Sequence, residues 1–68
     1  MDPILEMLGP DLSGAIIAAR TRLSDDTVTC RIEAYNDLPG QVVVCRAGDD
    51  LQHGLSIEGA VAYIAGLQ

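Results

Sequence analysis

The pattern of apolar and polar positions divides the chain into helical and extended segments. Asp2-Pro3 is typical of a helix start, and Gly9-Pro10 predicts that this first helix stops or kinks there. From residue 10 to residue 23, apolar residues recur at the spacing of one helix face, which predicts a second helical stretch. This apolar stripe consists of Leu12, Ala15, Ile16, Ala19 and Leu23.

Residues 27–35 alternate between polar and apolar side chains and give the clearest strand signal in the chain. Turn-forming residues follow at 36–40, and residues 41–47 predict a second strand. We therefore expect a β-hairpin. The core-facing positions of its first strand are Val28, Cys30, Ile32 and Ala34.

A four-residue loop over residues 36–39 sets the expected pairing of these strands. Cys30 then faces Cys45, and the other pairs on that face, Ile32 with Val43 and Val28 with Ala47, are all apolar. A shift by one residue would place Arg46 on the core face, which disfavours it. Directly opposed strand cysteines are strained when bonded, so we expect two free, buried thiols.

The remaining segments complete an expected α+β fold. Gly48-Asp49-Asp50 predicts a turn, and residues 51–55 fit either a short third strand or a loop. Ser56 is a suitable N-cap for a final helix from Ile57 to about Leu67. We expect one domain over residues 1–68, with the N-terminal helix kinked or split at Gly9-Pro10 and the C-terminal helix packed on the hairpin sheet.

The C-terminal helix has apolar or small residues on both sides. Its expected inward stripe is Ile57, Ala60, Val61, Ile64 and Leu67, whereas Gly59, Ala62, Ala65 and Gly66 lie opposite. Glycine inside a helix costs about 1 kcal/mol relative to alanine, so two glycines suggest close approach of another backbone. The face either binds a partner or a second copy, or it lies between the sheet and the N-terminal helices. The interaction candidates on this helix are Gly59, Ala62, Tyr63 and Gly66.

Charge narrows the class of partner. Ten acidic residues against four arginines and no lysine give a net charge of −6. This balance argues against direct binding of nucleic acid or anionic membranes and favours a basic protein surface. Two acidic pairs flank the open end of the hairpin and are further interaction candidates: Asp25 and Asp26, and Asp49 and Asp50. With no signal-peptide pattern and no apolar run long enough to cross a bilayer, we expect a cytoplasmic protein.

Residues that could carry chemistry are few. His53 is the only histidine, and Cys30 and Cys45 lie in strand patterns where a small buried hydrophobe fits well. Two cysteines and one histidine do not form a zinc set, and the four clustered aspartates fit turns better than a cation site. The glycine spacing matches no phosphate-binding loop. We therefore expect no enzyme, no metal and no cofactor.

The element order resembles that of the double-stranded-RNA-binding domain, and Gly54-Leu55-Ser56 before an alanine-containing helix is similar to that family's helix start. The family's basic cluster at this point is replaced by Ile57, Glu58 and Gly59, so the resemblance does not imply RNA binding. Small phage head–tail joining proteins also resemble the chain in helix–hairpin–helix order, and small phage inhibitors of host defence resemble it in length and acidity. These likenesses assign no family.

Two hypotheses follow. The first is a small acidic protein-binding module, an inhibitor or adaptor of phage or mobile-element type, that occupies a surface of a larger, basic or nucleic-acid-binding protein. The alternative is a structural subunit, similar to the phage head–tail joining proteins, that forms a homodimer or small assembly through the C-terminal helix.

Overall fold

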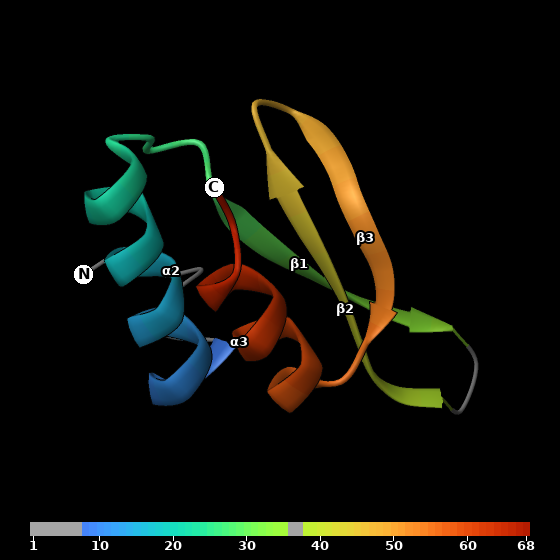
Figure 1. Ribbon diagram of the computed structural model, residues 1–68. Helices are drawn as coiled ribbons and strands as arrows, with labels where there is room; N and C mark the ends of the chain where they lie inside the picture. The colour runs from blue at the N-terminus through green and yellow to red at the C-terminus, as the bar shows by residue number, and fades with distance from the viewer. Residues whose placement is uncertain (1–7, 36–37) are drawn as a thin grey trace.

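In a computed structural model of the chain, two helices cover one face of a three-stranded antiparallel sheet (Figure 1). The structure describes residues 8–35 and 38–68, and for residues 34, 35 and 38–41 the backbone alone. The expected α+β fold is confirmed, and the segment over residues 51–55 belongs to a third strand. The elements in chain order are α2 (Pro10–Leu23), β1 (Thr29–Tyr35), β2 (Leu38–Arg46), β3 (Asp49–Leu55) and α3 (Ile57–Ala65).

The predicted break at Gly9-Pro10 is present. Leu8 is helical, Gly9 has a φ of 88°, and α2 begins at Pro10. This backbone conformation suits glycine, and proline is favoured in the first helical turn. The helix expected before Leu8 lies outside the described residues. The predicted stripe of α2 faces the core, where Leu12, Ile16 and Ala19 are fully buried.

Helix α3 lies between α2 and the sheet and contacts α2, β2 and β3. Ala60 and Ile64 are fully buried in this position. At the start of α3, the Ser56 hydroxyl accepts the Gly59 N–H at 3.0 Å, as the sequence predicted for an N-cap. Ile57 does not face the core as expected and is 45% exposed. It lines an open groove between the first turns of the two helices instead.

The hairpin is present, but its predicted register is wrong by one residue. Cys30 is paired with Val44 and Thr29 with Cys45, so Cys30 and Cys45 do not face each other. Cys30 lies on the helix-covered face of the sheet among the core residues, whereas Cys45 lies on the other face. Both thiols are free and buried. Because successive side chains of a strand alternate between faces, a shift of one residue exchanges the two faces completely.

Arg46 explains why the observed register is stable. This register places Arg46 on the helix-covered face, which the sequence pattern disfavours. Arg46 is at the end of β2, however, where its Nε donates to Asp25 Oδ2 at 2.7 Å and its Nη1 to the Gln68 carbonyl at 2.8 Å. At the other end, the β1–β2 hairpin extends past the helices, and Ile32 is 48% exposed rather than in the core (Figure 1).

The turn between β2 and β3 also lies one residue earlier than predicted. Its central residues are Ala47 and Gly48, with φ values of 54° and 81°, and Arg46 pairs with Asp49 across it. Positive φ at both central positions is the requirement of a type I′ turn. Glycine meets this requirement at no steric cost, but alanine does not. Asp49 and Asp50 therefore begin β3 instead of forming the turn.

The strained alanine gives a test of this turn. We expect Ala47→Asn to stabilise the fold by about 0.5–1 kcal/mol, because asparagine tolerates a positive φ and Asn-Gly favours this turn type. Urea denaturation of the two proteins measures the difference. Ala65→Asn, in the exposed last turn of α3, is the control and should not stabilise. A loss of stability in the first variant would contradict the assigned turn.

The positions of the thiols test the register. Treatment of the folded chain with diamide should leave Cys30 and Cys45 as thiols, because their side chains lie on opposite faces of the sheet. The same treatment in denaturing urea should join them. Alkylation followed by intact-mass measurement counts the free thiols in each case. Rapid formation of an intramolecular disulfide in the folded chain would instead support the pairing of Cys30 with Cys45.

Candidate interaction surface

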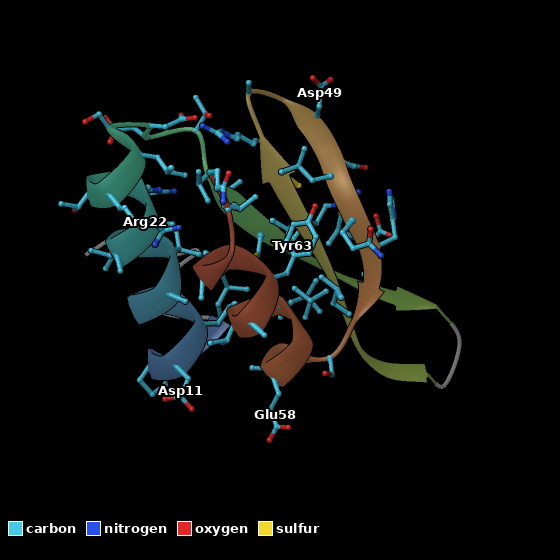
Figure 2. The ribbon with its side chains drawn as sticks, in the orientation of Figure 1. Asp11, Arg22, Asp49, Glu58 and Tyr63 are labelled. Carbon is cyan, nitrogen blue, oxygen red and sulfur yellow. The ribbon has the colours of Figure 1, made fainter. Side chains whose placement is uncertain are left out.

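The four arginines all make contacts within the fold, and two of them come from α2. The Nε of Arg20 donates to the Val28 carbonyl at 2.7 Å, which joins α2 to the segment that enters β1. Arg22 reaches the end of α3, where its Nη2 donates to the carbonyls of Ile64 and Leu67 at 3.1 and 2.9 Å (Figure 2). Because α3 has no basic residue in its own last turn, Arg22 supplies the cation that its negative dipole end favours.

Asp25 and Arg46 join three segments at one end of the molecule. Asp25 Oδ1 accepts hydrogen bonds from the Thr27 N–H at 2.9 Å and from the Thr27 hydroxyl, and Asp25 Oδ2 accepts from Arg46. The Thr27 hydroxyl oxygen in turn accepts the Ala47 N–H at 2.9 Å. These hydrogen bonds lower the pKa of Asp25 to about 2, with those from Thr27 and Arg46 the largest causes.

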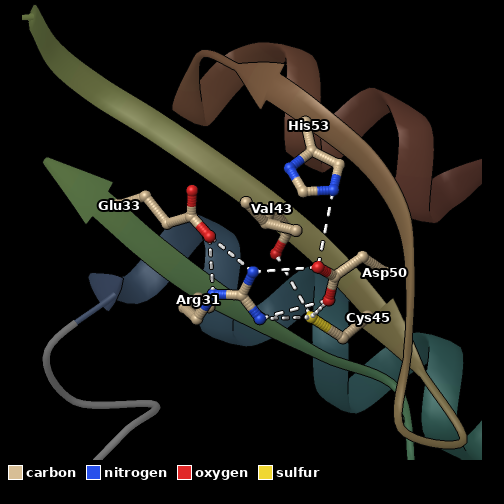
Figure 3. A network of polar contacts seen from close by, with 6 residues as sticks. All are labelled: Arg31, Glu33, Val43, Cys45, Asp50 and His53. Carbon is tan, nitrogen blue, oxygen red and sulfur yellow. Dashed lines mark hydrogen bonds and ion pairs between the residues drawn. The ribbon is translucent and has the colours of Figure 1, made fainter. Parts of the chain in front are cut away.

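The outer face of the sheet carries a network of polar contacts around Arg31 (Figure 3). Arg31 forms ion pairs with Glu33, its neighbour along β1, and with Asp50 on β3, where the Nη2–Oδ2 distance is 2.9 Å. His53 Nε2 lies 3.4 Å from the same Asp50 oxygen. Beneath these side chains Val43 is only 1% exposed, although neither α2 nor α3 covers this face. We call this set, Arg31, Glu33, Asp50 and His53, the outer-face network.

Cys45 joins the outer-face network without gaining reactivity. Its Sγ donates to Asp50 Oδ1 at 3.4 Å, and its side chain is 8% exposed. Burial, and then the hydrogen bond to Asp50, raises the pKa of the Cys45 thiol. Burial also raises the pKa of Cys30, to about 11. Both environments favour the protonated thiol, whereas nucleophilic cysteines require a stabilised thiolate.

Four acidic side chains in the described part of the chain form no ion pair. Asp25, Glu33 and Asp50 pair with arginine, and each arginine is already engaged. The four acidic residues that make no ion pair within residues 8–35 and 38–68 are Asp11, Asp26, Asp49 and Glu58. They are all exposed. Asp49 lies at one end of the molecule, and Asp11 and Glu58 lie at the other (Figure 2).

The structure therefore divides the acidic candidates that the sequence proposed. Asp25 and Asp50 are held in ion pairs, on opposite faces of the sheet, while Asp26 and Asp49 project into solvent. Neither Asp11 nor Glu58 was among the candidates. The signal that could have found them is the place of each in the first turn of its helix.

The interaction candidates on α3 also divide into residues that pack within the chain and residues that are exposed. Gly59 is close to Leu55 and Ser56, where a Cβ would lie 3.2 Å from the Ser56 Oγ. Tyr63 is half-buried and packs against the core (Figure 2). Only Ala62 and Gly66 are exposed. The first glycine and the tyrosine thus serve packing within the chain, which leaves a narrow outward strip of small residues.

Comparison with known proteins identifies no relative: no family model, no curated protein and no solved structure matches the chain. Among the described residues, no three histidine, cysteine or acidic side chains are grouped as a metal ion would require. Within the same residues, neither helix has both the length and the apolar character needed to cross a membrane.

The lowered pKa of Asp25 predicts how stability depends on pH. A carboxyl group with a folded-state pKa near 2 and an ordinary value of 3.8 stabilises the fold above about pH 4 and loses this effect as the pH falls toward 2. Asp25→Asn should therefore destabilise the chain at pH 7, and the difference from the unmodified chain should shrink between pH 4 and pH 2. Urea midpoints measured from pH 2 to pH 7 test this. The control is Asp26→Asn, which removes the adjacent exposed carboxyl group and should give a curve parallel to that of the unmodified chain.

Proposed function

We propose that this chain is a small acidic protein-binding module, an inhibitor or adaptor that occupies a basic surface of a larger protein. The observation that carries the proposal is that all four arginines make contacts within the fold. Arg20 and Arg22 donate to backbone carbonyls, and Arg31 and Arg46 pair with three carboxylates. All four arginines therefore make contacts that stabilise the fold. None of them forms an ion pair with Asp11, Asp26, Asp49 or Glu58.

An uncancelled acidic surface has two effects on association. It accelerates the encounter with a basic protein through long-range attraction, and it disfavours contact with other acidic surfaces. A second copy of this chain carries the same charge of −6, so self-association works against this repulsion. The outward strip of α3 that the sequence suggested for self-association, Ala62 and Gly66, has small side chains that bury little area in exchange. These points favour the binding module over the homodimer.

The experiment starts from partners captured from a lysate of the source organism on the immobilised chain and then purified. We expect the affinity of the true partner to fall at least tenfold between 50 and 500 mM NaCl, because salt screens exposed charges. The variant Asp11→Asn, Asp26→Asn, Asp49→Asn, Glu58→Gln should bind as weakly at low salt as the unmodified chain does at high salt. Calorimetry with the purified partner measures both effects.

A matched variant separates this function from the alternative. Ala62→Gln with Ala65→Gln enlarges two exposed side chains of α3 without changing the charge. We expect it to bind the partner normally. Binding that is insensitive to salt and to the acidic substitutions, but lost in this variant, would contradict the proposal and assign the interaction to α3. Light scattering shows whether that interaction is with a second copy.

A further inference from the structure

A groove between the first turns of α2 and α3 combines apolar and acidic walls. It is a shallow, open groove with a volume of about 320 Å³, and its described lining residues are Asp11, Ile57, Glu58 and Val61. Ile57 and Val61 are one helical turn apart on α3, and Ile57 is 45% exposed at the first position of the helix. Figure 2 shows Asp11 and Glu58 at this same end of the molecule, each in the first turn of its helix.

The size of the groove limits what can bind there. Small-molecule pockets usually have volumes of about 300–1,000 Å³ and enclose most of their ligand. This groove is at the lower limit and open on one side, so it fits one or two side chains of a larger partner. An exposed isoleucine beside a half-buried valine provides the apolar contact that such an anchoring side chain needs.

The charges beside the groove determine which side chains fit. Among the described residues of its lining, the two charged ones are acidic, and the four arginines make their contacts elsewhere. A second copy that met this surface symmetrically would bring Asp11 and Glu58 against the same carboxylates, which is unfavourable. A lysine or arginine can place its aliphatic stem along Ile57 and its charge beside the carboxylates.

We propose that this groove is the docking site for a basic amphipathic segment of the partner protein. One large aliphatic side chain of the segment contacts Ile57 and Val61, and flanking lysine or arginine residues pair with Asp11 and Glu58. This inference rests on the proposed function and assigns it to one end of the molecule. The other exposed carboxylates, Asp26 and Asp49, then contribute long-range attraction without direct contact.

The test uses a synthetic twelve-residue amphipathic peptide of leucine and lysine, titrated into the labelled full chain at 50 mM NaCl and followed by NMR. We expect the largest methyl shifts at Ile57 and Val61. Glu58→Lys should weaken binding at least tenfold. Asp49→Lys changes the net charge equally at the opposite end of the molecule and should weaken binding less than threefold. Glu58→Gln is a second, milder variant in case the reversed charge at the helix start disturbs folding, and it should also weaken binding more than Asp49→Asn does.

Three results would overturn the groove assignment. The first is equal weakening by the Glu58 and Asp49 substitutions, or peptide-induced shifts centred on Asp26 and Asp49. The second is a failure of the peptide to bind at low salt. The third is a set of NOEs in the free chain that join the methyl groups of Ile57 or Val61 to residues 1–7, since the groove would then be filled by the chain itself. The proposed function would survive each of them if a captured basic partner still binds in a salt-dependent way.

Discussion

The packing of α3 between α2 and the sheet is the contact on which the rest of the structure depends. A helix of nine residues is too short to be stable alone, so burial has to hold it. With no phenylalanine or tryptophan in the chain, this burial uses aliphatic side chains of both helices and of β2, among them Ile16, Val44 and Ile64. A core of this kind has no large aromatic anchor, and its stability comes from complete exclusion of water: these three side chains have no exposed area.

Arginine side chains complete what the small core leaves open. Arg22 stabilises the end of α3, and Arg20 joins α2 to the segment that enters β1. Arg46 joins Asp25 to Gln68. Arg31 contributes on the face of the sheet opposite α2 and α3, where the outer-face network shields Val43 from water. In a larger domain further layers of side chains would perform these tasks. Here the four arginines perform these tasks. As a consequence, Asp11, Asp26, Asp49 and Glu58 form no ion pair within the described part of the chain.

The same contacts determine the state of the two thiols. Cys45 has a carboxylate as its neighbour and Cys30 lies in the aliphatic core, so both remain protonated. The single histidine, His53, lies beside Asp50 in the outer-face network. The described surface also has exposed carboxylates and a shallow apolar groove, the two features on which the proposed function and the docking site rest.

The sequence by itself determined the elements of this fold. Helical spacing marked α2 from Pro10 to Leu23, strict alternation marked β1, and Ser56 marked the start of α3, because each signal depends on neighbouring residues only. Residues 51–55 carried no such signal, since β3 is exposed along nearly all its length and has no face to bury. The net charge of the chain was also evident, but not which carboxylates remain free.

Only the tertiary structure decided the register, and with it the faces of the cysteines. In the local sequence pattern, an arginine on the helix-covered face is a buried charge without a partner, which would be costly. The cost disappears because Arg46 ends its strand beside Asp25, a residue twenty-one positions away whose proximity no local pattern reveals. The exposure of Ile57 has a similar origin, since it depends on where α3 begins relative to α2. Contacts between distant segments fix such details, and local pattern alone does not contain them.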